Sequence, residues 1–224
     1  YVFANFGNGD DMPSLDVLME NETSIVYVKD SATGEFVEQQ RMEGTNSIWK
    51  DLEEMPLHMQ HAIVAIEDER FYDHYGVDWK RTISAMANLV LHFSDVEYGG
   101  STITQQLVRL VTDEKEHSIQ RKITEIFRAI ELEQEYYTKE QILEAYLNIM
   151  PLTGNIVGVG AGANYYFGKG VEDLSLAECA VLASITNNPS LYNPYTHPEN
   201  VRSRQRVVLR KMYELEWITE EEYK

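Results

Sequence analysis

The stretch AIEDERFYDHYG, residues 65–76, places three consecutive acids directly before aromatic side chains. If the stretch is helical, Glu67, Phe71 and His74 fall at offsets 0, 4 and 7 and share one stripe of the helix. Glu67 would then lie beside the apolar core. A carboxylate at the edge of an apolar wall loses water, which suits it to accept or donate a proton near neutral pH. The alternative is a solvated helix start, where acidic residues are common.

Length and composition favour a globular protein with a sizeable core. The chain has 224 residues, of which 43% are hydrophobic. Its 37 acidic and 19 basic residues give a net charge of −18, which would repel nucleic acid, so no nucleic-acid partner is expected. Any anionic ligand must therefore meet local cations. The single cysteine, Cys179, excludes an internal disulfide.

Residues 1–50 differ in pattern from the rest of the chain. SIVYV (24–28) and EFVEQQ (35–40) alternate in the manner of a short hairpin. We expect residues 1–50 to be a linker and hairpin annex that follows a membrane anchor missing from this chain. From residue 51 to 224, apolar residues recur at spacings of three and four, which is typical of helices. The sequence therefore predicts a mostly α fold with a small N-terminal β-hairpin annex.

Several helix starts carry a residue whose side-chain oxygen can cap a helix. The predicted caps are Asp78, Ser101, Ser118, Thr138 and Ser175. One of the predicted helices runs from residue 57 to residue 71 and so includes the acidic stretch.

Two glycines, followed by hydroxyl and amide side chains, precede a predicted helix in YGGSTITQQLVRL, residues 98–110. Backbone N–H groups of a first helical turn, with the hydroxyls of Ser101 and Thr102 and the guanidinium of Arg109, could hold phosphate oxygens. The alternative is an ordinary glycine turn that Ser101 caps.

The segment SIQRKITEIFR, residues 118–128, sets two cations around one acid. Arg121 and Glu125 are spaced i, i+4, and Lys122 and Glu125 are spaced i, i+3, so both cations flank one carboxylate. Ile123 and Phe127 are expected to face inward, with Glu125 beside that face. The alternative is an ion pair on the surface, which would contribute little to stability.

Taken in order and spacing, four segments resemble successive signatures of the peptidoglycan glycosyltransferases, the family-51 transferase module of class A penicillin-binding proteins. The segments are EDERFYDHYG (67–76), GSTITQQ (100–106), RKITE (121–125) and KEQILEAYLN (139–148). The resemblance extends from about residue 57 to residue 212. Arg109 stands where the family more often has lysine, which keeps the charge and changes the donor geometry.

The resemblance implies a lysozyme-like helical domain that polymerises lipid II, a lipid-linked disaccharide-peptide, with inversion at the anomeric carbon of the donor. Glu67 would be the general base, and Glu125 would orient the donor and the cations. Arg109, Arg121 and Lys122 would stabilise the lipid-pyrophosphate leaving group.

The other expected site residues fall into two groups. Those expected to bind substrate are Asp68, Ser101, Thr102, Gln105, Gln106 and Asn148. Those expected to give structural support are Phe71, His74 and Gly76. The chemistry admits a divalent cation, Mg²⁺ or Mn²⁺, as the sole cofactor, and the sequence identifies no ligand set for it.

The resemblance also implies partners and a location. The partners are lipid II, the growing glycan strand, the membrane surface and a penicillin-binding transpeptidase domain elsewhere in the full-length chain. The location is the extracytoplasmic face of the bacterial plasma membrane. ISAMANLVLHF (83–93) is the expected apolar patch on the bilayer, with a buried core helix as its alternative.

Two other functions stay open on the sequence alone. The first is a lysozyme-like glycan hydrolase that uses Glu67 as an acid, against which the cations suited to a pyrophosphate argue. The second is a catalytically silent lipid-binding module, against which the presence of both Glu67 and Glu125 argues.

Overall fold

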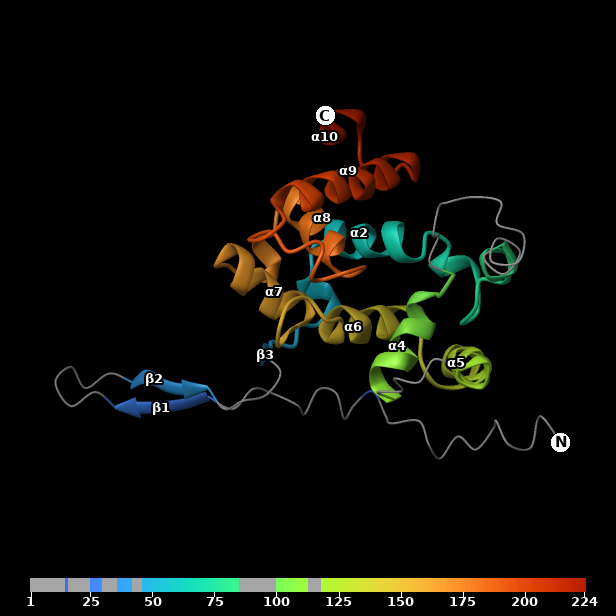
Figure 1. The fold of residues 1–224 in the computed structure, drawn as a ribbon, viewed down its shortest axis with the longest axis horizontal. Helices are drawn as coiled ribbons and strands as arrows, with labels where there is room; N and C mark the ends of the chain where they lie inside the picture. Colours follow the sequence, from blue (N-terminus) through green and yellow to red (C-terminus); the bar gives the residue numbers. More distant parts are fainter. Residues whose placement is uncertain (1–14, 16–24, 30–35, 42–45, 85–99, 113–117) are drawn as a thin grey trace.

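The computed structural model of the chain is mostly helical, which confirms the α class expected from the sequence (Figure 1). It describes residue 15 and residues 25–29, 36–41, 46–84, 100–112 and 118–224. Among these residues the α-helices are α2 (Leu57–Glu67), α4 (Ile103–Thr112), α5 (Ile119–Glu131), α6 (Lys139–Ile149), α7 (Gly158–Phe167), α8 (Leu176–Ile185), α9 (Pro198–Glu214) and α10 (Glu220–Tyr223), and residues 79–84 are helical as well. Shorter helical segments are η3 (Leu52–Glu54), η4 (Phe71–Asp73), the π-helical η5 (Leu132–Tyr136) and η6 (Val171–Asp173).

The core forms where α2 packs against α8 and α9, and where α4 packs against α5 and α6 (Figure 1). The sequence of α8, LAECAVLASI, is apolar on every side, so this helix must be covered all round. Cys179, Leu182 and Ile185 of α8 are completely buried. Each large apolar side chain buried in this way stabilises the fold by about 1.5 to 3 kcal/mol.

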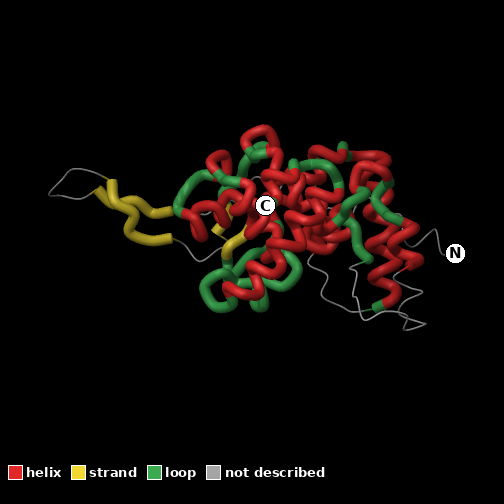
Figure 2. The backbone as a smooth tube through the Cα atoms, turned by 90° about the horizontal axis from the view of Figure 1, so that it is seen from above, coloured by secondary structure: helices red, strands yellow, loops and turns green. Residues whose placement is uncertain are grey.

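Two pairs of short strands complete the described structure. β1 (Ile25–Lys29) and β2 (Phe36–Arg41) pair antiparallel, close to the residues where the sequence predicts a hairpin. They stand apart from the helices, at one end of the molecule (Figure 2). β3 (Asn46–Ser47) pairs parallel with β4 (Ile156–Val157), which fastens the chain before α2 to the chain before α7.

Three predicted helix caps are confirmed, because Ser118, Thr138 and Ser175 each accept a hydrogen bond from a backbone N–H in the first turn of the following helix. The prediction for Ser101 is wrong. Thr102 caps α4 instead, since its hydroxyl accepts from the backbone N–H of Gln105 at 3.1 Å. The side-chain oxygen of Gln105 accepts from the Thr102 N–H at 2.9 Å, which completes a reciprocal cap.

The predicted helix through the acidic stretch is too long. α2 ends at Glu67, and Asp68 leaves the helical conformation with φ −157° and ψ 72°. The reason is a contact outside the helix, because the Asp68 carboxylate accepts a hydrogen bond from the backbone N–H of Ile103 at 3.0 Å. Glu67, Phe71 and His74 therefore share no helical stripe, and the turn after α2 positions them instead.

None of the helices in the described part of the chain is long and apolar enough to cross a membrane. The segment 83–93, expected to lie on a bilayer, falls outside the described residues except at Ile83 and Ser84. The Ile83 side chain is exposed.

The turn after α2 rests directly on α5 through Gly76. This residue has φ +73°, and a Cβ on it would lie 2.3 Å from the carbonyl oxygen of Ala129 in α5. The hydroxyl of Thr102 donates to the carbonyl oxygen of Gly76 at 2.6 Å. The start of α4, the turn after α2 and the middle of α5 are thereby held together.

Replacing Gly76 with alanine is expected to lower the free energy of unfolding by about 2 to 5 kcal/mol, from left-handed backbone strain and overpacking combined. Gly168→Ala is the matched control, since Gly168 has φ +66° but nothing within 4 Å of an added Cβ. In the control, only the left-handed backbone strain should lower the free energy of unfolding, by about 1 to 2 kcal/mol. Urea unfolding of both variants measures the difference, and equal losses would contradict the proposed contact with α5.

Candidate active site

Glu67 is the last residue of α2, and its half-buried carboxylate is held from two sides. Oε2 accepts a hydrogen bond from Nε2 of Gln106 in α4 at 2.9 Å. Oε1 accepts from the hydroxyl of Thr186, the residue that ends α8, at 2.7 Å. A carboxylate has about four acceptor positions, so these two contacts leave lone pairs that can take a proton.

The orientation of Gln106 is set by a buried tyrosine. The hydroxyl of Tyr146 in α6 donates to the side-chain oxygen of Gln106 at 3.0 Å, which turns the amide nitrogen toward Glu67. Burial raises the pKa of the Tyr146 hydroxyl well above its ordinary value, and the charge of Glu67 acts in the same direction. Tyr146 therefore remains a hydrogen-bond donor across the physiological pH range.

Asp68 is completely buried beside Glu67. Its carboxylate faces Nε2 of His74 at 3.0 Å and accepts from the backbone N–H of Ile103 at 3.0 Å. The sequence predicts that Asp68 binds substrate, but its side chain has no exposed surface from which to do so. Its contacts instead join the end of α2 to the start of α4.

Two arginines and an aspartate brace the backbone of Glu67. Asp78 accepts from the backbone N–H of Arg81 at 3.0 Å, as the sequence predicts for a helix cap. Arg81 in turn donates a guanidinium N–H to the carbonyl oxygen of Glu67 at 2.6 Å. Arg70 binds the second oxygen of Asp78 through two N–H groups, at 2.6 and 2.9 Å.

The second predicted acid, Glu125 in α5, is surrounded by cations as the spacing predicts. It forms an ion pair with Arg121 at 2.6 Å and another with Lys122. Glu125 is only 2% exposed, whereas Ile123 is 38% exposed, so the expectation that Ile123 faces inward is wrong, while Phe127 is half-buried. The two ion pairs offset the desolvation cost of burying this carboxylate. Glu125, and not Ile123, therefore faces the interior.

One short segment contacts Glu67 directly and is linked to Glu125 through Lys122. Lys122 donates to the hydroxyl of Ser101 at 2.9 Å, while Gln106 donates to Glu67 at 2.9 Å. Ser101 and Gln106 are five positions apart at the start of α4. The structure thus brings Glu67 and the Glu125 cluster to opposite ends of one helical turn and a half.

Two of the backbone N–H groups in the first turn of α4 already donate to side chains of the protein. The N–H of Ile103 is taken by Asp68, and the N–H of Gln105 is taken by Thr102. Thr102 and Gln105, expected among the substrate-binding residues, are both completely buried. These two N–H groups are therefore not available to an anion, and the cationic side chains nearby become the more important contacts.

Two further predicted residues differ in their surroundings. Arg109 is exposed on α4, and its charge is near enough to act on the hydroxyl of Tyr146. Asn148 in α6 binds the backbone of Lys50 through both its oxygen and its nitrogen, at 2.9 and 2.8 Å. Its expected role in substrate binding stays a prediction.

Sequence reasoning missed three residues that contact the predicted site: Tyr146, Arg81 and Thr186. Tyr146 lies inside the segment 139–148 that resembles a family signature, but its helical spacing to Ile142 and Ile149 indicates core packing rather than a contact with the site. Thr186 ends the apolar run LAECAVLASIT, where only its position at a helix end sets it apart.

The residues that the structure describes do not assemble a protein-built metal centre. Within the described ranges no group of three or more His, Cys, Asp or Glu side chains lies in metal-binding arrangement. Both oxygens of Glu125 already face cations. The donor set therefore does not fit a resident divalent ion, and the predicted Mg²⁺ or Mn²⁺ stays a prediction.

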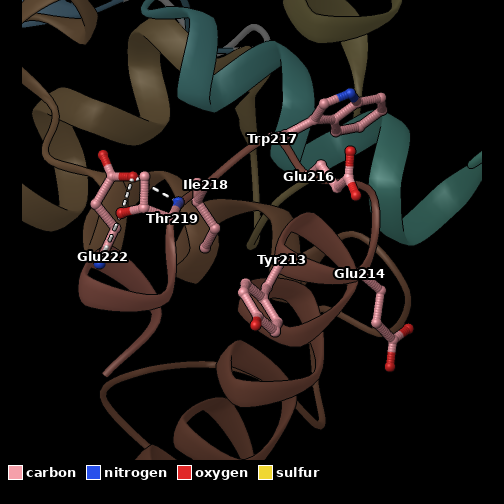
Figure 3. A pocket seen from close by; sticks show the side chains of 7 residues that line it. All are labelled: Tyr213, Glu214, Glu216, Trp217, Ile218, Thr219 and Glu222. Atoms are coloured by element: carbon pink, nitrogen blue, oxygen red, sulfur yellow. Dashed lines mark hydrogen bonds between the residues drawn. The ribbon is translucent and has the colours of Figure 1, made fainter.

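A hollow of about 440 Å³ lies elsewhere, between the end of α9 and α10 (Figure 3). Its lining consists of Tyr213, Glu214, Glu216, Trp217, Ile218, Thr219 and Glu222. Glu222 accepts from the Thr219 hydroxyl at 2.8 Å as part of the cap of α10, and Trp217 stacks on His61. The hollow contains none of the predicted site residues, so it is not the candidate active site.

Comparison with known proteins gives consistent matches. Residues 33–213 match the family described as "Transglycosylase". A penicillin-binding protein 1A of Clostridium botulinum (strain Hall) is 37% identical over 231 residues, covering 99% of this chain and 27% of the relative. The penicillin-binding protein 1A of Vibrio cholerae is 44% identical, covering 77% of this chain and 21% of the relative, and that of Escherichia coli K12 is 38% identical, covering 95% and 24%.

This chain therefore spans about a quarter of the length of these curated relatives. Among solved structures, penicillin-binding protein 1A from Haemophilus influenzae matches with a TM-score of 0.48 at 21% identity, covering 90% of this chain and 19% of that one.

The brace beneath Glu67 predicts a pH-dependent stability. Burial alone would raise the pKa of Asp78, but the Arg81 N–H and the Arg70 guanidinium outweigh it and lower this pKa below its ordinary value. A lowered folded-state pKa adds stability above the unfolded-state pKa, and that stability is lost as pH falls through the folded-state pKa. Asp78→Asn is expected to cost about 1 to 3 kcal/mol at pH 7.

The difference between wild type and Asp78→Asn should shrink between about pH 5 and pH 2, which urea unfolding across that range measures. Asp73→Asn serves as the control, because Asp73 is exposed, and it should change stability by less than about 0.5 kcal/mol. A difference for Asp78→Asn that stays constant down to pH 2 would contradict the brace.

Proposed function

The chain belongs to the transglycosylase family of glycosyltransferases, and we propose that it polymerises lipid II into the glycan strands of peptidoglycan. The reaction inverts the configuration at the anomeric carbon of the donor. The observation that carries this proposal is the shared segment 101–106, which holds a carboxylate at one end and a cation cluster at the other.

Glu67 is the general base of the proposed reaction. The attacking group is a sugar hydroxyl, which is a poor nucleophile until a base removes its proton in the transition state. The bond from this oxygen to the donor carbon forms, the proton passes to Glu67, and the bond from that carbon to the phosphate oxygen breaks. Gln106 and Thr186 fix the plane of the carboxylate for this transfer.

Cations stabilise the leaving group, which departs as a lipid diphosphate with the bonding electron pair. It is acidic enough to leave without a proton, so it needs positive charge rather than a general acid. Lys122, whose side chain is 36% exposed, and Arg121 carry two charges against the one of Glu125. Arg109 adds a third cation from the exposed side of α4. Glu125 orients these side chains.

The buried residues support this arrangement. Asp68, Thr102 and Gln105 hold the start of α4 against the end of α2, and Ser101 holds Lys122. Phe71 and Gly76 shape the turn that follows the base. We propose no step that passes through a metal ion.

Exposed apolar side chains beside the base suit a membrane-bound substrate. Tyr75, Trp79 and Ile83 follow Glu67 in sequence and are 70%, 55% and 62% exposed. On a surface exposed to water such side chains do not stabilise the fold. At a membrane interface tyrosine, tryptophan and isoleucine are favourable, because their apolar parts leave the water. We propose that this side of the domain rests on the extracytoplasmic face of the plasma membrane, where lipid II keeps its tail in the bilayer.

The length of the relatives supports one further part of the proposal. Because this chain spans about a quarter of their length, we propose that the full-length protein also carries a penicillin-binding transpeptidase domain.

A polymerisation assay with purified lipid II tests the function. Glu67→Gln is expected to lower the polymerisation rate by at least about 100-fold, because the amide cannot accept the proton, while lipid II binding is retained. Glu69→Gln is the matched control: Glu69 lies two positions on and makes an exposed ion pair with Lys211 at 2.7 Å. The control should keep the wild-type rate.

The alternatives give different products. Release of fragments from purified glycan strands, with no chain growth from lipid II, would replace the transferase by a lysozyme-like hydrolase. If the wild-type protein binds lipid II but does not polymerise it, the result supports the catalytically silent lipid-binding module instead of the transferase. Full polymerisation by Glu67→Gln would refute the assignment of the base.

A further inference from the structure

A closed ring of polar contacts lies next to the predicted base and includes three residues with no role so far, Lys139, Glu133 and Thr104. The ring runs from Asp68 to His74, Lys139, Glu133, Thr104 and, through the neighbouring backbone, Ile103, which donates back to Asp68. Lys139 forms an ion pair with Glu133 at 2.7 Å, and the hydroxyl of Thr104 donates to the other oxygen of Glu133. The ring therefore ties together α2, η4, η5, α6 and α4.

The ring is largely shielded from water. The side chains of Asp68 and Glu133 are 0% and 2% exposed, and those of His74 and Lys139 are 9% and 17% exposed. An ion pair taken out of water loses hydration that its mutual attraction does not always restore. Burial also lowers the pKa of Lys139, although Glu133 opposes this. A pair of this kind adds little stability but can fix one arrangement of its neighbours.

Lys139 determines which nitrogen of His74 carries the proton. The ammonium group lies 3.5 Å from Nδ1 of His74 and 4.3 Å from the centroid of the Phe71 ring. An ammonium group can only donate hydrogen bonds, so Nδ1 must be the acceptor and Nε2 must carry the hydrogen. Nε2 faces both oxygens of Asp68, at 3.0 and 3.2 Å, and so donates to that carboxylate.

We propose that Lys139 and Glu133 are positioning residues for the transferase reaction, an inference that rests on the proposed function. Glu133 holds Lys139, and Lys139 keeps His74 as the neutral Nε2–H tautomer. His74 then completes the hydrogen bonds of Asp68, which closes the end of α2 onto the first turn of α4. Glu67 and its partner Gln106 come from those two elements, so the ring sets the direction of the carboxylate.

The same contacts would also fit a purely structural role. A structural role and a positioning role differ in their effects on thermal stability and on kcat. A structural pair lowers thermal stability and lowers activity only as far as the protein unfolds. A positioning pair lowers kcat in the folded enzyme, because a misdirected base slows proton removal while the substrate still binds. The tautomer of His74 separates the roles further, since stability alone does not determine it.

The first measurement is the ¹⁵N NMR spectrum of the imidazole groups in the wild-type protein. The signals of His74 are identified by their loss in His74→Gln, among the six histidines of the chain. We expect Nε2 to appear as a protonated nitrogen and Nδ1 as an unprotonated one. The Nδ1–H tautomer, or an imidazolium at pH 7, would overturn the proposal without any variant or activity assay.

The second measurement is lipid II polymerisation by Lys139→Met and Glu133→Gln. We expect kcat to fall about 10- to 100-fold in each, with KM for lipid II changed by less than about threefold. In Lys139→Met, the His74 signals should also show a mixture of tautomers. Val208→Ala is the control, since it opens a cavity at a completely buried position of α9 and lowers Tm without touching the ring.

Wild-type kcat in both ring variants, or a loss no larger than that of Val208→Ala at an equal decrease in Tm, would overturn the proposal. If the wild-type protein polymerises nothing, the proposed function fails, whereas the His74 tautomer still shows whether the ring forms as described.

Discussion

The arrangement of the site depends on the buried carboxylate of Asp68. A carboxylate without exposed surface costs several kcal/mol unless hydrogen-bond donors surround it. The donors here are His74 and the backbone N–H of Ile103, which belong to different segments of the chain. The hydrogen bonds that the Asp68 carboxylate needs therefore hold the end of α2 against the start of α4. Glu67 directly precedes Asp68, so the position of the proposed base follows from that closure.

Local charge, rather than the charge of the whole chain, decides what the site can bind. The net charge of −18 would disfavour a diphosphate if all charges acted equally. At physiological ionic strength exposed charges are screened beyond about 8 Å, so acids elsewhere on the surface contribute little. Arg121 and Lys122 share one carboxylate, Glu125, and leave one positive charge in excess. Since the N–H groups of Ile103 and Gln105 in the first turn of α4 already have acceptors, this excess positive charge is the main attraction for an anion.

The sequence predicts the local part of this structure well and the long-range part poorly. The cluster of Arg121, Lys122 and Glu125 follows from helical spacing alone, and four of the five predicted caps follow from residue type. Contacts between distant segments leave no periodic signal: Thr186 meets Glu67 across 119 positions. The prediction that Ile123 of α5 faces inward is also wrong, because counting apolar residues ignores that two cations can draw Glu125 into the interior. The early end of α2 has the same kind of cause, a partner on another helix.

The rigidity of the proposed base derives from the core rather than from the site itself. Thr186 directly follows α8, whose last four residues, Leu182 to Ile185, are completely buried, so its hydroxyl cannot shift far unless that helix moves. Gln106 stands on α4 and is oriented by the buried Tyr146 of α6. Two separately packed helices thus donate one hydrogen bond to each oxygen of Glu67. In the proposed reaction the acceptor hydroxyl must approach along the remaining lone pairs, so the packing of the core fixes its direction of attack, as inversion at one face of the donor sugar requires.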